Sequence, residues 1–223
     1  MPSLDTVKAS NAAYAPSYLP VAVFTGGTSG IGKAMAEAFA RYTNGRAHII
    51  IIGRNRSAGE AIVASFPKPS EDGWTHEFIP CDASLMSNVR STCAALSRRL
   101  TRINYLVLAA GYMSFTATEE TSEGLDRQLA LRYYSRYVFV ECLLPLLDAA
   151  RAGGEDARVM SVLGGGRASR VDLGDLGVRK ARKGWFGFAG FKAAIQSVGY
   201  NDLMMVVRSS LSIPPFFRRD HAD

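Results

Sequence analysis

Cysteine and histidine are scarce in this chain of 223 residues, which has three of each. The cysteines, Cys81, Cys93 and Cys142, are odd in number and widely spaced, so they form neither a disulfide framework nor a zinc motif. We therefore expect a reducing compartment. The histidines share no metal-ligand spacing either. The sequence accordingly predicts no metal site.

Long apolar runs and blocks of like charge are also lacking. No run reaches the about 20 residues of a membrane span, and the N-terminus, with Asp5 and Lys8, lacks the apolar core of a signal peptide. We expect a cytoplasmic protein with no membrane partner. The net charge of +6 is mild, and no basic run is interleaved with aromatic residues, so we expect no nucleic-acid partner.

What remains is the composition of a globular protein, 48% hydrophobic and 21% charged. A chain of 223 residues without repeats or a linker predicts one domain. We divide it into an N-terminal arm (1–17), a dinucleotide-binding domain (18–207) and a tail (208–223). The arm is rich in polar and small residues and is expected to be partly mobile.

A glycine-rich stretch at residues 24–32 organises the domain. It follows an apolar run and precedes a helical pattern, which together predict a strand, a turn and a helix. Gly26 permits a tight turn, Gly30 lets the backbone approach a pyrophosphate, and Gly32 lets the helix lie close to the strand. Free N–H groups at the helix start favour phosphates. The alternative is an ordinary strand-to-helix turn. The predicted cofactor contacts here are Thr25, Gly26, Thr28, Ser29, Gly30, Ile31 and Gly32.

Strand and helix patterns alternate along the chain. Residues 47–52 are continuously apolar except for His48, which suits a parallel strand covered on both faces. Pro145 falls inside one predicted helix and is expected to kink or break it. The strands are predicted at 21–24, 47–52, 76–79, 105–109 and 158–163, and the helices at 30–43, 57–65, 84–100, 123–152 and 186–207. The fold class is therefore α/β.

The second predicted strand ends in Gly53, Arg54, Asn55 and Arg56. In dinucleotide-binding folds an acidic residue here binds the ribose 2′-hydroxyl of NAD, whereas an arginine accommodates the 2′-phosphate of NADP. No acid is present, so the sequence favours NADP(H), with Arg54 and Asn55 as contacts. The alternative is that one of the two arginines is a solvated loop charge.

The spacing T-G-x-x-x-G-I-G resembles the cofactor loop of the short-chain dehydrogenase/reductase family, and the resemblance runs over about 21–205. It implies a Rossmann-like, doubly wound parallel sheet of strand order 3-2-1-4-5. It also implies that Asp82 contacts the adenine, although a helix cap for 84–100 is an equal alternative. The sequence Ala109-Ala110-Gly111 resembles the family's Asn-Ala-Gly, so Ala110 and Gly111 are expected to border the cofactor.

Members of this family typically use an Asn-Ser-Tyr-Lys set for catalysis. Residues 188–192 resemble the Tyr-x-x-x-Lys motif, in which Lys192 fits and Phe188 stands where the tyrosine belongs. The serine position falls on about Gly164 and the asparagine position on about Arg132. Three of the four roles therefore lack their usual side chain.

Two interpretations of these positions remain open. In one, the fold has lost the usual chemistry. In the other, the site is rebuilt: Arg132 polarises a carbonyl or binds an anionic substrate, and Lys192 holds the cofactor ribose. Arg132 can equally be a surface or ion-pair residue. Tyr112, Tyr133 or Tyr134 is a candidate proton donor, although none is placed at the nicotinamide by the sequence.

Segments 121–125, 133–136, 143–147 and 161–164 resemble a fungal branch of the family that often accompanies secondary-metabolite pathways and includes cyclases as well as reductases. Family members continue past the lysine helix into two more strands, which the sequence after Val207 does not resemble. We therefore expect the sheet to lack the last family strands, and a truncated or mis-spliced product is one hypothesis.

The sequence thus predicts an atypical NADP(H)-dependent oxidoreductase that reduces a carbonyl of a small secondary metabolite. The alternative is a non-redox NADP-binding cyclase or isomerase, or a catalytically inactive family member. Pairing through the long helices predicted at 123–152 and 186–207 would give a homodimer.

Overall fold

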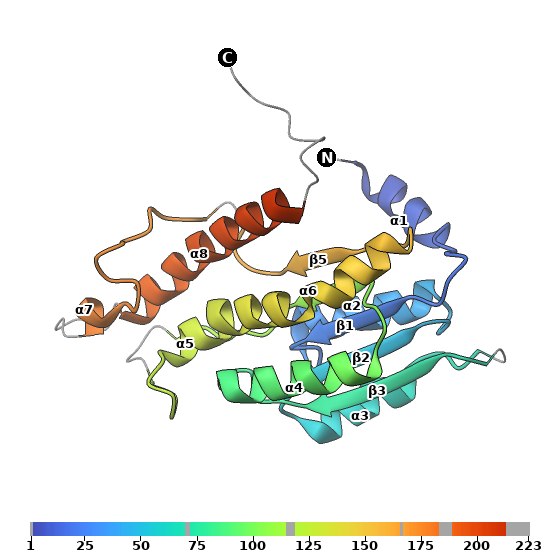
Figure 1. The fold of residues 1–223 in the computed structure, drawn as a ribbon, viewed down its shortest axis with the longest axis horizontal. Helices are drawn as coiled ribbons and strands as arrows, with labels where there is room; N and C mark the ends of the chain where they lie inside the picture. Colours follow the sequence, from blue (N-terminus) through green and yellow to red (C-terminus); the bar gives the residue numbers. More distant parts are fainter. Residues whose placement is uncertain (1, 70–71, 115–118, 166, 183–188, 213–223) are drawn as a thin grey trace, which may run out of the picture.

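The computed structural model describes residues 2–69, 72–114, 119–165, 167–182 and 189–212. At its centre is a five-stranded parallel sheet in the order β3-β2-β1-β4-β5 (Figure 1). The strands are β1 (Val21–Thr25), β2 (His48–Gly53), β3 (Thr75–Pro80), β4 (Tyr105–Leu108) and β5 (Arg158–Ser161). The predicted fold class and strand order are confirmed.

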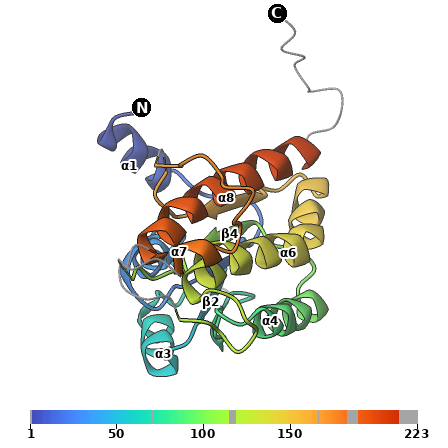
Figure 2. The same cartoon turned by 90° about the vertical axis from the view of Figure 1, so that its left-hand side faces the viewer.

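Helices cover both faces of the sheet (Figures 1 and 2). The helices of the described residues are α1 (Leu4–Ala12), α2 (Gly30–Tyr42), α3 (Arg56–Ser65), α4 (Met86–Arg99), α5 (Arg127–Leu129), the π-helical turn η1 (Ala130–Tyr134), α6 (Ser135–Ala152), α7 (Arg179–Arg182) and α8 (Ala189–Ser212). Among the described residues, none of these helices has the length and apolarity needed to cross a bilayer.

The two faces of the sheet have separate apolar cores. Ile50 and Ile52 of β2 pack in the core under α4 and α6, whereas Ile49 and Ile51 pack in the core under α2 and α3. Successive strand residues point to opposite faces, so a continuous isoleucine run fills both cores. The apolar run that predicted this strand is therefore explained by the burial of both faces of β2.

The helix predicted at 123–152 is divided in the structure. A turn forms first, with the Gly124 N–H donating to the Thr121 carbonyl, and Asp126 then caps α5 by accepting from the Leu129 N–H at 2.8 Å. The turn η1 follows, and α6 continues through Pro145, so of the predicted kink or break the break was wrong. At the other end of the chain, α8 extends to Ser212, so the boundary predicted at 207 falls inside a helix.

The N-terminal arm is more ordered than its composition indicates. Ser3 caps α1 by accepting from the Thr6 N–H at 3.1 Å, and no residue of this helix is buried. Tyr14, near the end of the arm, hydrogen-bonds Tyr105 of β4 at 2.8 Å, and Tyr18, just after the arm, donates to Asp156 at 3.1 Å. These contacts attach the end of the arm to the domain, whereas α1 itself is exposed.

Candidate active site

A cleft of about 850 Å³ opens where the carboxyl ends of β1, β2 and β4 meet. This is the switch point of a doubly wound sheet, where ligands bind. The predicted site residues that line it are Thr25, Gly26, Thr28, Ser29, Gly30, Ile31, Gly32, Arg54, Asn55, Ala110, Gly111 and Arg132. Asp82 and Lys192 are not among the residues that line this cleft.

The glycine turn between β1 and α2 leaves room for a ligand. Gly26 has a φ of +72°, and a Cβ atom there would lie 2.5 Å from the Ala110 nitrogen, so only glycine fits. At Gly30, with a φ of +55°, a Cβ atom would meet nothing within 4 Å. Ser29 makes no side-chain cap hydrogen bond, which leaves the first N–H groups of α2 for a ligand. The turn therefore fits a pyrophosphate.

The two arginines at the end of β2, Arg54 and Arg56, have different surroundings. Arg54 is exposed and lines the cleft. Arg56 donates to Glu60 at 2.9 Å as a surface pair one helical turn apart, and it is not among the cleft-lining residues. Asn55 lines the cleft and also caps α3 by accepting from the Ala58 N–H at 3.0 Å.

Asp82 lies in a second hollow that it shares with Arg54. Its carboxylate accepts from the backbone N–H and the hydroxyl of Ser84, at 3.0 and 2.7 Å. Burial acts to raise the pKa of Asp82, but these hydrogen bonds outweigh it and the pKa is lowered. Asp82 is not the cap of the following helix, because Glu123 accepts from the first N–H groups of α4, including that of Met86 at 2.6 Å. The cap alternative was therefore wrong.

Arg132 lies in η1 and is 8% exposed. Its guanidinium donates to the Ser197 hydroxyl at 2.9 Å and to the Ala194 carbonyl at 3.2 Å, which ties the turn to α8. Burial lowers the pKa of Arg132. The alternative of a structural surface or ion-pair residue was wrong about the surface and the ion pair, because this side chain is buried and both of these partners are neutral. A structural role is supported, because the two hydrogen bonds join η1 to α8.

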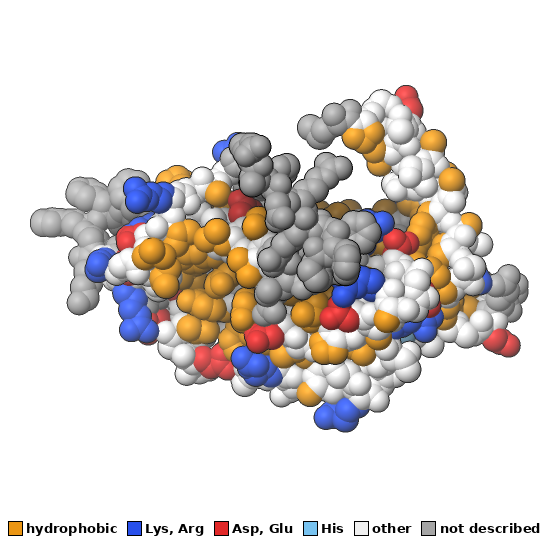
Figure 3. Space-filling view, turned by 45° about the horizontal axis from the view of Figure 1, so that its top comes forward, with side chains coloured by type: hydrophobic (Ala, Val, Ile, Leu, Met, Phe, Trp, Pro, Cys, Tyr) orange, Lys and Arg blue, Asp and Glu red, His pale blue; other side chains and the backbone are white. Residues whose placement is uncertain are grey.

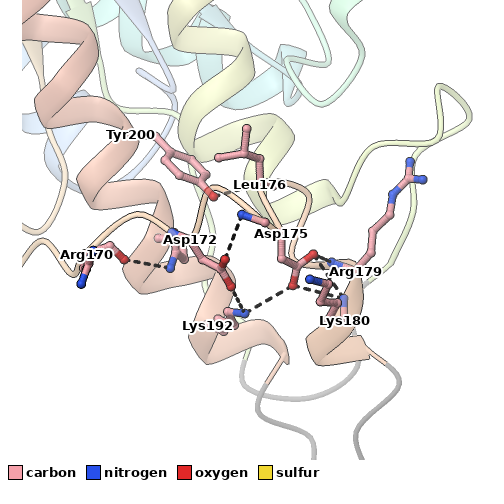
Figure 4. Close-up of polar contacts among 10 residues, drawn as sticks. Arg170, Asp172, Asp175, Leu176, Arg179, Lys180, Lys192 and Tyr200 are labelled. Carbon is pink, nitrogen blue, oxygen red and sulfur yellow. Dashed lines mark hydrogen bonds and ion pairs between the residues drawn. The ribbon is translucent and has the colours of Figure 1, made fainter.

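Lys192 is not among the residues that line the cleft. Its ammonium pairs with Asp172 at 3.2 Å and Asp175 at 3.3 Å (Figure 4). The hydrogen bond to Asp172 raises the pKa of Lys192. Asp175 also accepts from the N–H of Arg179 at 2.7 Å, so it joins the loop before α7 to α8. In this arrangement Lys192 does not contact a ribose in the cleft, and Phe188 lies outside the described residues.

One functional candidate, Arg136 of α6, is absent from the sequence prediction. It is 1% exposed, lines the cleft, and donates to the Ser161 hydroxyl at 2.6 Å and the Ala110 carbonyl at 2.8 Å. The available signal was a charge four residues after Arg132 in a helix expected to pack against the sheet. Its partners come from β5 and from the end of β4, which the helical pattern alone does not reveal.

Other groups on the cleft wall complete the site. Tyr112 lines the cleft, whereas Tyr133 and Tyr134 line a different groove. Burial raises the pKa of Tyr112, so its hydroxyl stays protonated at neutral pH. Leu163 and Gly164 line the cleft where the family's serine is expected, and neither has a hydroxyl.

A model of the short chain dehydrogenase family matches residues 20–170. The chain belongs to the short-chain dehydrogenase family. An oxidoreductase of Emericella nidulans is 38% identical over 179 residues, which are 80% of this chain and 52% of the relative. The oxidoreductase andH of Emericella variicolor is 33% identical over 94% of this chain and 60% of the relative. These fungal relatives confirm the predicted branch, and the chain spans only about half to three fifths of their length.

Solved structures of short-chain dehydrogenases share the fold. The NADP complex of RhlG from Pseudomonas aeruginosa has a TM-score of 0.61 at 22% identity, over 86% of this chain and 67% of that chain. The NADH-dependent reductase A1-R' complexed with NAD has a TM-score of 0.56 at 20% identity, over 86% of this chain and 72% of that chain. At these identities the likeness shows the arrangement of strands and helices rather than the cofactor.

Proposed function

We propose that this short-chain dehydrogenase is an atypical NADP(H)-dependent oxidoreductase that reduces a carbonyl of a small secondary metabolite. The observation that supports this proposal is that one cleft is lined both by the glycine turn with Arg54 and by Arg132, Arg136 and Tyr112. The glycine turn and Arg54 suit a nucleotide phosphate. The other three side chains provide charge and a proton for a carbonyl oxygen. The fungal oxidoreductase relatives support this class of reaction.

The preference for NADP(H) rests on Arg54. The turn at Gly26 to Gly32 would hold the pyrophosphate through its N–H groups, and Arg54 would pair with the 2′-phosphate. No carboxylate follows β2 at the place where NAD-binding folds need one to accept from the 2′-hydroxyl. Asp82, which sits beside Arg54, remains proposed as an adenine contact.

The bound nicotinamide would supply the hydride. Arg132 would stabilise the negative charge that develops on the carbonyl oxygen, since a buried guanidinium acts strongly in a site with little water. Tyr112 would donate the proton, because it lines the same cleft and its hydroxyl is protonated at neutral pH. Burial raises the pKa of Tyr112, which makes it a weaker acid than an ordinary tyrosine. For Lys192 to hold the ribose, as its position in the family motif predicts, its contacts with Asp172 and Asp175 would first have to break.

The cofactor preference is tested by titrating NADPH and NADH against the purified chain and following nucleotide fluorescence. We expect NADPH to bind at least tenfold more tightly, and Arg54→Asp to remove that preference, because one phosphate pair is worth about 1.4 kcal/mol or more. Equal affinity of the parent for the two nucleotides would contradict the assignment.

A second function, a non-redox or inactive nucleotide-binding protein, is favoured by two observations. Leu163 and Gly164 occupy the wall where the family's serine is expected, and Lys192 is bound outside the cleft. NADPH oxidation over a broad panel of carbonyl compounds separates the two functions. Turnover of any compound excludes the second, whereas nucleotide binding without turnover of any panel member favours it.

We also propose a homodimer that pairs through α8 and the start of α6. An apolar groove of about 610 Å³ lies between these helices and the loop before α7, and apolar side chains gather on the face shown in Figure 3. The groove is lined by Tyr133, Tyr134, Tyr137, Val171, Leu173, Leu176, Tyr200, Leu203, Met204 and Val207. An exposed apolar patch of this kind favours association. Sedimentation of the purified chain as a monomer at micromolar concentration would exclude the homodimer.

A further inference from the structure

Two arginines converge at the β4 end of the cleft. Arg132 and Arg136 are four residues apart, and both line the cleft wall. Gly111, which follows β4, lies beside both: a Cβ atom there would be 3.6 Å from Cγ of Arg132 and 3.8 Å from a terminal nitrogen of Arg136. The stem of Arg132 and the guanidinium of Arg136 therefore lie beside one short stretch of the cleft.

Neither arginine has a carboxylate partner within the described part of the chain. Arg136 donates to the Ser161 hydroxyl and the Ala110 carbonyl, and Arg132 donates to the Ser197 hydroxyl and to a backbone carbonyl of α8. All of these acceptors are neutral. The Nε atom of Arg136 is buried and has no hydrogen-bond partner among the described residues. The positive charge is thus solvated by dipoles alone.

This arrangement is costly without a bound anion. Arginine is almost never fully buried unless it is paired, and Arg136 is 1% exposed. Burial, together with the nearby charge of Arg132, lowers the pKa of Arg136 to about 10, so Arg136 is still charged at neutral pH. An anion between or beside the two groups would offset their repulsion and their loss of water.

We propose that Arg136 and Arg132 form a binding site for a carboxylate of the substrate. The planar fork of a guanidinium matches the two oxygens of a carboxylate. The glycine turn and Arg54 are other lining residues of the same cleft and are proposed to contact the phosphates of a nucleotide. This proposal narrows the substrate of the proposed reductase to carbonyl compounds that carry a carboxylate. The identity of the reaction depends on the proposed function. The carboxylate site does not, because its binding is measured without turnover.

The test compares sodium benzoate with benzamide, which has the same ring and no charge. Thermal unfolding of the purified chain is followed at one ionic strength, kept constant with sodium chloride. We expect benzoate to raise the midpoint temperature by about 3–5 °C when its concentration reaches ten times its dissociation constant. Benzamide should give little shift. Equal shifts with the two compounds would overturn the proposal.

The variant Arg136→Met should bind benzoate at least about tenfold more weakly, because the fork is lost while the apolar stem remains. The control is Arg98→Met, which removes the same charge from an exposed position on α4 and should leave the benzoate shift unchanged. An unchanged shift in Arg136→Met would overturn the proposal. If circular dichroism shows that this variant does not fold, Arg132→Gln is measured instead, with the same expected loss.

A repeat with saturating NADP⁺ separates the substrate site from the phosphate sites. A benzoate shift that persists supports a distinct carboxylate site, whereas a shift that disappears means that the anion occupies the cofactor's place, and the proposal fails. If NADP⁺ itself does not bind, the proposed function fails, but benzoate and Arg136→Met still decide the carboxylate site.

Discussion

The two parts of the cleft are built in different ways. On the proposed nucleotide side, the expected ligand contacts are backbone groups of one short turn, which the glycines at 26, 30 and 32 permit. On the proposed substrate side they are long side chains whose positions depend on distant partners: Arg132 is held by Ser197, 65 residues away, and Arg136 by Ser161, 25 residues away. A backbone site is therefore specified locally, whereas a side-chain site is specified by the tertiary structure.

The largest loss of stability on the nucleotide side is expected for Gly26→Ala. A left-handed φ costs an alanine about 1–2 kcal/mol, and the Cβ contact of 2.5 Å with the Ala110 nitrogen requires a backbone shift of similar or greater cost. We expect urea unfolding to show a loss of about 3 kcal/mol or more. The matched variant Gly30→Ala, which faces open space, should lose only about 1–2 kcal/mol but should bind NADPH poorly. Equal losses of stability in the two variants would contradict this account of the turn.

Outside the cleft, where Lys192 is held, we expect an intermediate effect from Asp175→Asn. The carboxylate accepts from the N–H groups of Arg179 and Lys180 and pairs with Lys192 (Figure 4), so its loss should cost about 1–2 kcal/mol in urea unfolding at pH 7. The control Asp148→Asn breaks only an exposed pair with Arg151 and should cost less than about 0.5 kcal/mol.

The same variant has a defined pH dependence. Burial acts to raise the pKa of Asp175, but hydrogen bonds from Lys180, Arg179 and Lys192 outweigh it and hold the pKa below its ordinary value of 3.8. A carboxyl with a lowered folded pKa stabilises the protein above that ordinary value, and the contribution disappears as the pH falls through the folded pKa. The difference between parent and Asp175→Asn should therefore shrink between pH 5 and pH 2. A difference that stays constant over this range would rule out the charged contact.

The smallest changes in stability and in NADPH affinity are expected at Arg56. Arg56→Ala removes a surface pair with Glu60 and should cost less than about 0.5 kcal/mol in stability. It should change NADPH affinity less than about threefold in the same fluorescence titration that tests Arg54→Asp. A loss as large as that of Arg54→Asp would show that both arginines contact the phosphate.

How well each element could be predicted depends on where in the sequence the residues that determine it lie. The parallel sheet was predicted because β2 has an isoleucine run that fills two cores, and the cofactor turn because three glycines stand at fixed spacing. The π-helical turn at Arg132 was missed, since the periodicity of 123–152 is compatible with one continuous helix. The partners of Lys192 were also missed, because Asp172 and Asp175 lie 20 and 17 residues earlier in a loop without periodicity. For α1, a local signal was present in the cap of Ser3 on Thr6.

The contacts of Tyr18 determine when this part of the chain can complete its folding. Tyr18 both donates to the Asp156 carboxylate and accepts from the Asp156 N–H, and 138 residues separate the two. Contacts of such separation close late, because the loop between them must first be ordered. During synthesis Tyr18 leaves the ribosome before Asp156, which lies two places before β5. Tyr18 therefore reaches its native contacts only after the strands from β1 to β4 have been synthesised.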